Sequence, residues 1–205
     1  MFLLQPSLRD EDEFGKNIFL AFSAVLTKVF SHPEDHQIEN GSPLTTLPVF
    51  GVEWSVSFKV KLSSFAKGYA HCLNLVKESG QKIVKVVLTS DKKFRVFFGY
   101  PFLNAATDYI EDHSLPSLGV WTKIEIAQVM QGSTTNIVFM KNDNIVGKLE
   151  NPQPKNMFAV NVFVVKPGIT FQPGTIKELT IRTDLSGSNL SQNYLMNVYL
   201  YQQDL

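Results

Sequence analysis

The sequence contains one cysteine among its 205 residues, no excess of charge of either sign and no long hydrophobic run. One cysteine cannot close a disulfide within the chain, so packing alone must hold the fold. Lys and Arg together number 19, as do Asp and Glu, which gives a formal net charge of zero. Nucleic acids and anionic membranes retain proteins through a basic excess, so we expect neither as a partner. The longest apolar run, residues 18–26, is far shorter than the ~20 residues that span a bilayer, so membrane insertion is not expected.

What the sequence has in abundance is alternation of apolar and polar side chains with period two. Residues 54–62 show it best, because every second residue is apolar and the residues between them are Ser or Lys. Period two places the two sets on opposite faces of a strand. Further strands are predicted over residues 83–89, 93–98, 122–128, 136–140, 145–149, 158–165, 176–182 and 194–201, with turn residues between them. Many short strands with regular turn signals predict an antiparallel sandwich or barrel.

Two segments need separate interpretation. Residues 17–30 could form an amphipathic helix, but their Phe, Val and Thr content favours one or two strands. Residues 137–147 predict a hairpin whose turn is Asn142-Asp143-Asn144, since Asn and Asp tolerate the left-handed backbone of tight turns. No linker rich in Pro, Gly or Ser divides the chain, so we predict one domain over residues 1–205.

The order of these segments carries a resemblance. The strand at 53–61 is followed by Ala-His-Cys-Leu-Asn-Leu at 70–75, Lys-Phe-Arg-Val at 93–96 and Gly-Val-Trp-Thr-Lys-Ile-Glu-Ile at 119–126. The Asn-Asp-Asn hairpin, Asn-Val-Phe-Val at 161–164 and Pro-Gly-Thr-Ile-Lys at 173–177 complete the series. This succession resembles the concanavalin A-like lectin/glucanase superfamily, in its laminin G-like and pentraxin-like branch. The resemblance is strongest over residues 45–184. It implies an all-β, two-sheet antiparallel jelly-roll sandwich, to which residues 1–44 and 185–205 would add strands.

The resemblance also implies binding of glycans or proteins by the curved sheet or its loops, often with calcium. We therefore favour a non-enzymatic, lectin-like module that recognises glycans or glycoproteins outside the cell. Two Asn-x-Ser sequons, at Asn40 and Asn189, are consistent with secretion. A laminin G-like adhesion or matrix module is the first alternative, and zero net charge would permit homo-oligomers. A glycoside hydrolase is the second, disfavoured because Glu11 and Glu13 do not form the flanking carboxylate pair that such enzymes use.

The candidate ligand-binding residues lie in two places. The long polar stretch between Gly99 and Gly119 is of a length that is usually functional or carries structure of its own. It supplies Tyr100, Asn104, Asp108 and Tyr109, and the predicted hairpin turn supplies Asn142, Asp143 and Asn144. Their amides and carboxylates would hydrogen-bond to sugar hydroxyls while a Tyr ring stacks on the pyranose. With Glu111 and Asp112, the same oxygens could serve calcium, which takes six to eight of them, although no metal ligand can be assigned.

Trp121 can be placed on either face of its predicted strand. It lies two and four residues before Lys123 and Glu125, so strict alternation would place it with them on the outer face of the strand. Large aromatic side chains are mostly buried, so we predict a core position, reached through a bulge near Gly119.

Cysteine and histidine offer little chemistry. Cys72 is predicted to be a buried thiol rather than a nucleophile, because adjacent strand residues point to opposite faces and His71 could not share its proton. His32 and His36 have the spacing of metal ligands on a helix, but Pro33 and the polar residues around it favour an exposed loop.

Overall fold

The computed structural model describes residues 27–99, 109–131 and 133–184, and every regular element in these ranges is a β-strand. Within them no helix is long and apolar enough to cross a lipid bilayer. In chain order the strands are β1 (Thr27–His32), β2 (His36–Gln37), β3 (Thr45–Phe50), β4 (Glu53–Leu62), β5 (Ala70–Lys77), β6 (Lys82–Leu88), β7 (Phe94–Phe98), β8 (Tyr109–Glu111), β9 (Trp121–Gln131), β10 (Thr134–Lys141), β11 (Asn144–Glu150), β12 (Met157–Phe163) and β13 (Gly174–Asp184).

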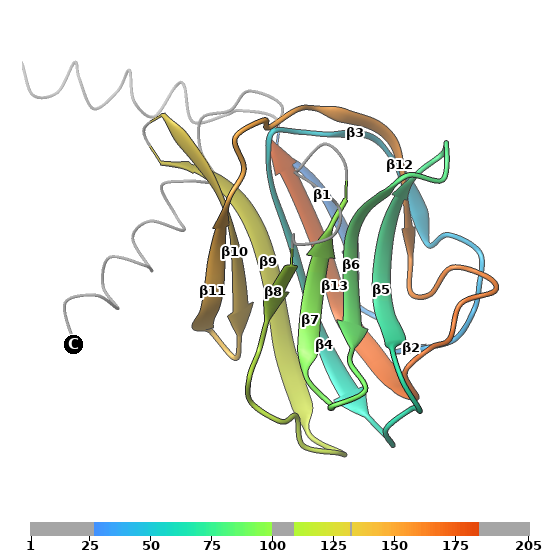
Figure 1. Cartoon of the computed structure of the whole chain (residues 1–205). Coiled ribbons are helices and arrows are strands. Elements are labelled where there is room, and N and C mark those ends of the chain that lie inside the picture. The colour runs from blue at the N-terminus through green and yellow to red at the C-terminus, as the bar shows by residue number, and fades with distance from the viewer. Residues whose placement is uncertain (1–26, 100–108, 132, 185–205) are drawn as a thin grey trace, which may run out of the picture.

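The strands form two antiparallel sheets that face each other (Figure 1). The seven-stranded sheet has the order β1-β13-β4-β9-β10-β11, with β2 beside β13, and the six-stranded sheet has the order β3-β12-β5-β6-β7-β8. Strands that are far apart in the sequence are neighbours, such as β4 between β13 and β9. The predicted all-β, two-sheet jelly-roll sandwich is therefore confirmed.

The strand predicted most clearly, residues 54–62, lies within β4, and its five apolar side chains are at most 1% exposed. The other predicted strands within the described residues correspond to β6, β7 and β9–β13. Residues 27–30 belong to β1, which bears out the strand interpretation for that part of residues 17–30. The predicted strand at 194–201 lies outside the described residues. The period-two pattern did not predict β2, β3, β5 or β8. Pro48 interrupts the edge strand β3, two register shifts break the pairing of β5 with β6, and β2 and β8 have only two and three residues.

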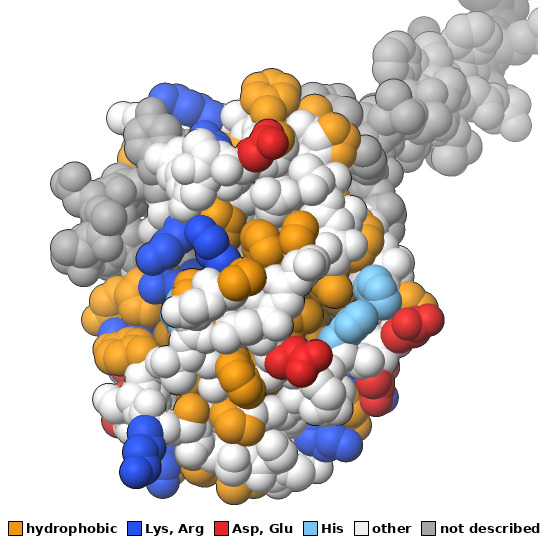
Figure 2. Space-filling model, turned by 90° about the vertical axis from the view of Figure 1, so that its right-hand side faces the viewer, with side chains coloured by type: hydrophobic (Ala, Val, Ile, Leu, Met, Phe, Trp, Pro, Cys, Tyr) orange, Lys and Arg blue, Asp and Glu red, His pale blue; other side chains and the backbone are white. Residues whose placement is uncertain are grey.

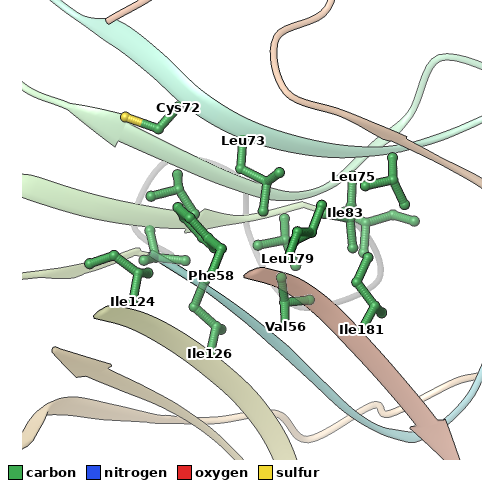
Figure 3. Packing of buried hydrophobic residues seen from close by; sticks show 14 of the residues in the cluster. Val56, Phe58, Cys72, Leu73, Leu75, Ile83, Ile124, Ile126, Leu179 and Ile181 are labelled. Atoms are coloured by element: carbon green, nitrogen blue, oxygen red, sulfur yellow. The ribbon is translucent and has the colours of Figure 1, made fainter. Parts of the chain in front are cut away.

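The core lies between the two sheets, where side chains from β4, β9 and β13 point toward those of β5 and β6 (Figure 3). Phe58 and Ile126 on one side meet Leu73 and Ile83 on the other, and none of them is more than 1% exposed. Cys72 is also fully buried, and this burial raises the pKa of its thiol to about 12. The thiol stays protonated at neutral pH, so the prediction of an unreactive buried cysteine is confirmed.

One edge of the sandwich is closed by β8, which packs against β11 of the other sheet. Gly147 of β11 makes this possible, because an added Cβ would lie 2.6 Å from Cγ2 of Ile110. The close approach brings residues 111–114, which follow β8, next to the β10–β11 hairpin. The candidate site is built around the turn of this hairpin.

Candidate functional site

Asn142 and Asp143 form the turn that connects β10 to β11, and Asn144 begins β11, so the predicted hairpin is confirmed. Asn142 and Asp143 have φ angles of 49° and 66°, the left-handed backbone that two-residue hairpin turns require. The Oδ1 atom of Asn142 accepts a hydrogen bond from the backbone N–H of Lys123 at 2.8 Å. The backbone N–H of Asn142 donates to the Lys123 carbonyl at 2.9 Å. The turn is thereby fixed to the beginning of β9.

A hollow of about 260 Å³ lies beside this turn, and we call it the Trp121 hollow. Its lining side chains come from three adjacent strands and the turn: Lys59, Trp121, Lys123, Asn142, Asp143 and Lys177. It lies on the outer face of the seven-stranded sheet, away from the core. An aromatic ring is thus exposed at the surface together with ammonium, amide and carboxylate groups.

The prediction that Trp121 lies in the core is wrong. The pairing of β4 with β9 runs without a shift from Lys61–Trp121 to Trp54–Gln128, so no bulge turns the indole inward. Trp121 is half-buried on the outer face. The ammonium groups of Lys61 and Lys177 lie 4.8 Å and 4.4 Å from its ring centroid. Cation–π contacts with lysine therefore take the place of core packing.

Three lysines lie in one row across the strands of this face. Lys123 of β9 is opposite Lys59 of β4, and Lys59 is opposite Lys177 of β13. Like charges that face each other on neighbouring strands destabilise a sheet. The row therefore costs stability unless carboxylates or a ligand neutralise it.

Three carboxylates contact the three lysines of this row. Lys123 contacts Asp143 at 2.5 Å and Glu125 at 3.3 Å, and the hydrogen bond that Lys123 donates to Asp143 raises the pKa of Lys123. Glu178 contacts Lys59 at 2.7 Å and Lys177 at 3.7 Å, and the hydrogen bond from Lys59 lowers the pKa of Glu178. One carboxylate is thus shared by two lysines.

A second hollow, of about 430 Å³, lies on the other side of the turn, and we call it the Asp112 hollow. Its lining residues are Glu111, Asp112, His113, Ser114, Lys141, Asn142, Asn144, Ile145 and Val146. The ammonium of Lys141 donates hydrogen bonds to Asp112 and Ser114. Burial alone would raise the pKa of Asp112, but hydrogen bonds from Lys141 and Ser114 outweigh it and hold the pKa below its ordinary value.

Tyr109 lies in a separate cluster on the outer face of the six-stranded sheet. Its ring centroid is 4.2 Å from Cζ of Arg95 and 5.6 Å from the ring of Phe97. Arg95 pairs with Glu111 and donates a hydrogen bond to the Tyr69 hydroxyl at 2.9 Å. The structure therefore places this predicted residue apart from the turn that carries Asn142, Asp143 and Asn144. Tyr100, Asn104 and Asp108 lie outside the described residues.

The calcium hypothesis stays a prediction. Within the ranges that the structure describes, no group of three or more His, Cys, Asp or Glu side chains is placed to hold a metal ion. Four of the proposed oxygen donors already have partners. Arg95 contacts Glu111, Lys141 contacts Asp112, and Lys123 contacts both Asp143 and Oδ1 of Asn142.

The histidine pair is closer than the sequence suggested. Figure 2 shows histidine side chains next to each other at the surface, with acidic side chains nearby. The imidazole nitrogens of His32 and His36 are 2.8 Å apart, and burial together with His32 lowers the pKa of His36. His32 ends β1 and His36 begins β2, so the predicted exposed loop is limited to the residues between them.

Comparison with known proteins shows a likeness in fold. No protein-family model matches the sequence, and no curated protein matches it. Among solved structures, a heptameric SAP-like pentraxin from Limulus polyphemus is similar, with a TM-score of 0.50 and 16% identity over 76% of this chain and 75% of that chain. The binding domain of botulinum neurotoxin serotype D has a TM-score of 0.51 and 14% identity, covering 84% of this chain and 47% of that chain.

A third similar structure is the Trypanosoma rangeli sialidase in complex with 2,3-difluorosialic acid. Its TM-score is 0.51 with 9% identity, covering 81% of this chain and 32% of that chain. This chain thus spans about half the length of the toxin domain and a third of that of the sialidase. At such low identities the likeness shows the fold alone.

Proposed function

We propose that this chain, a concanavalin A-like and pentraxin-like sandwich, is a non-enzymatic module that binds glycans at the Trp121 hollow. The observation that carries the proposal is a half-buried indole on a sheet face, within one hollow that also contains amide, carboxylate and ammonium groups. Binding sites for small polar ligands combine apolar or aromatic surface with a few well-placed polar groups. A pyranose offers the matching chemistry, an apolar C–H face and a rim of hydroxyls.

Each part of the hollow has a role in this proposal. The indole of Trp121 packs against the C–H face of the sugar ring, as an aromatic ring with large apolar area can do. Asp143 accepts hydrogen bonds from sugar hydroxyls, and the Asn142 amide and the lysine ammonium groups donate to them. The hydrogen bonds between Asn142 and Lys123 hold the turn in place before the ligand arrives. A site held in this way loses little conformational freedom on binding.

We favour binding over catalysis because of the carboxylates. Glycoside hydrolases use two carboxyl groups that flank the scissile bond. Among the described residues, Asp143 supplies the one carboxylate that lines the hollow, and it is engaged by Lys123.

The fold comparison gives limited further support. The toxin structure is a binding domain, and the sialidase, a third of which this chain matches, is in complex with a sialic acid derivative. Because fold does not determine function, the support for glycan binding comes from the hollow itself. Action outside the cell, glycoprotein partners and homo-oligomers remain part of the proposal.

A glycan array followed by titration tests the proposal. We expect the wild-type chain to bind glycans and Trp121→Ala to bind the best of them at least about tenfold more weakly, since the indole supplies both apolar area and ring geometry. Tyr109→Ala is the matched control, because it removes an exposed aromatic ring from the other sheet.

Two results would contradict the proposal. A blank array would exclude glycan binding and return attention to a laminin G-like protein-binding role. Loss of binding in Tyr109→Ala with full binding in Trp121→Ala would move the site to the six-stranded sheet.

A further inference from the structure

We infer that the glycan bound at the Trp121 hollow carries an acidic group, a carboxylate or a sulfate, and that Lys177, Lys59 and Lys123 hold this group beside the indole. The inference rests on the proposed function and specifies its ligand class. Three lysines and one aspartate line the hollow, while Glu125 and Glu178 contact these lysines from outside the lining. The lining itself is therefore cationic, although the whole chain has no net charge.

The cross-strand register supports this inference. Lys177, Lys59 and Lys123 lie directly opposite one another on three adjacent strands. Such a row is unfavourable in the free protein, because like charges oppose each other. An anion placed against the row would relieve this repulsion and accept charge-assisted hydrogen bonds from the ammonium groups.

The backbone of β13 shows how the row is held without a ligand. The pairing with β4 shifts between Lys177 and Thr180, so that Glu178 and Leu179 together oppose Phe58. In a regular strand Glu178 would point to the face opposite Lys177. The bulge leaves Leu179 fully buried and Glu178 exposed, in a left-handed conformation with φ 53°. Residues other than Gly rarely adopt this backbone conformation. Bulges are common near functional sites, where they redirect a side chain.

Glu178 thus acts as an internal substitute for the acidic group of the ligand. Its carboxylate lies 2.7 Å from Lys59 and 3.7 Å from Lys177. Lys177 has the longer of these two contacts, and its ammonium also lies over the indole at 4.4 Å. This ammonium is therefore placed to contact both a sugar stacked on Trp121 and an acidic substituent of that sugar.

Two substitutions should change affinity in opposite directions. Lys177→Ala removes the cation, and we expect binding of acidic glycans about tenfold weaker, as for loss of a charge-assisted hydrogen bond. Glu178→Gln keeps the size of the side chain but removes the competing negative charge, and we expect binding about twofold to threefold tighter. A purely structural role would not produce changes of opposite sign. Lys82→Ala is the control, because it removes a strand lysine from the other sheet.

The experiment is a glycan array with neutral, carboxylated and sulfated members, followed by titration of the strongest binders. Preference for acidic members that is lost in Lys177→Ala and kept in Lys82→Ala supports the inference, and the array distinguishes carboxylate from sulfate. Binding restricted to neutral glycans would overturn the inference and leave the proposed function standing. Binding to no glycan would overturn both. Equal effects of Lys177→Ala and Lys82→Ala, or weaker binding by Glu178→Gln, would also overturn the inference.

Discussion

The two hollows on either side of the hairpin turn contain similar charged groups but balance them differently. In the Asp112 hollow, the side chains of Lys141 and Asp112 are only 16% and 8% exposed, and Ser114 completes their hydrogen bonds. Around the Trp121 hollow, the carboxylates in contact with the lysines are mostly more exposed: Asp143 is 70%, Glu178 47% and Glu125 18% exposed. A buried ion pair whose hydrogen bonds are satisfied contributes to the stability of the fold. Exposed ion pairs are screened by water, so their lysines can exchange a carboxylate for a ligand.

This contrast explains why the larger hollow is not our candidate site. A ligand in the Asp112 hollow would have to displace Lys141 from a carboxylate that is nearly buried, and breaking such a pair is costly. A ligand in the Trp121 hollow would replace exposed carboxylates that water already screens. The size of a hollow therefore matters less here than the state of the charges within it.

The largest effect that we expect is a loss of stability in the Asp112 hollow. Lys141→Ala leaves the Asp112 carboxylate without its cation and should lower the free energy of unfolding by about 3 kcal/mol. Lys123→Ala removes exposed pairs and should lower it by less than about 1 kcal/mol. Urea unfolding gives both values. Glycan titration should show the reverse order, with binding weakened by Lys123→Ala only.

The double variant Lys141→Ala/Asp112→Asn is the control for this experiment. It removes the uncompensated charge and should recover part of the stability that Lys141→Ala loses. Equal losses of stability in Lys141→Ala and Lys123→Ala would remove the distinction between the two hollows.

A smaller effect on stability should appear at acidic pH. The pKa of Asp112 is lower in the folded chain than its ordinary value of 3.8, so its contribution to stability is present above that value and is lost as the pH falls through the folded pKa. Thermal unfolding between about pH 2 and pH 6 should therefore be less pH-dependent in Asp112→Asn than in the wild type. Glu178→Gln should change this dependence less, because Glu178 is exposed. An unchanged acid dependence in Asp112→Asn would contradict this assignment.

The sequence revealed features that depend on local chemistry. Alternation over residues 54–62 predicted β4 and its buried face, and Asn-Asp-Asn between apolar runs predicted the hairpin. Trp121 was misplaced because the general tendency of Trp to be buried was given more weight than its parity with Lys123. That parity was correct, since Lys59, Lys61 and Lys123 all face outward around the ring.

The lysine row could not be predicted from the sequence. Its members are separated by more than 50 residues along the chain, and they meet only because β4 lies between β9 and β13. The outward position of Glu178 depends on a bulge, which strict alternation cannot reveal. Cross-strand register is set by the whole fold, so a site assembled across three strands needs the structure.

The most direct test of the Trp121 site uses the two tryptophans of the chain. Trp54 is fully buried in the core, whereas Trp121 is half-buried in the hollow. In a two-dimensional NMR spectrum their indole N–H groups give two signals, which Trp121→Phe assigns. On titration with the glycan selected by the array, we expect a saturable shift of the Trp121 signal and almost none of the Trp54 signal. Saturable binding that leaves the Trp121 signal unmoved would contradict the account.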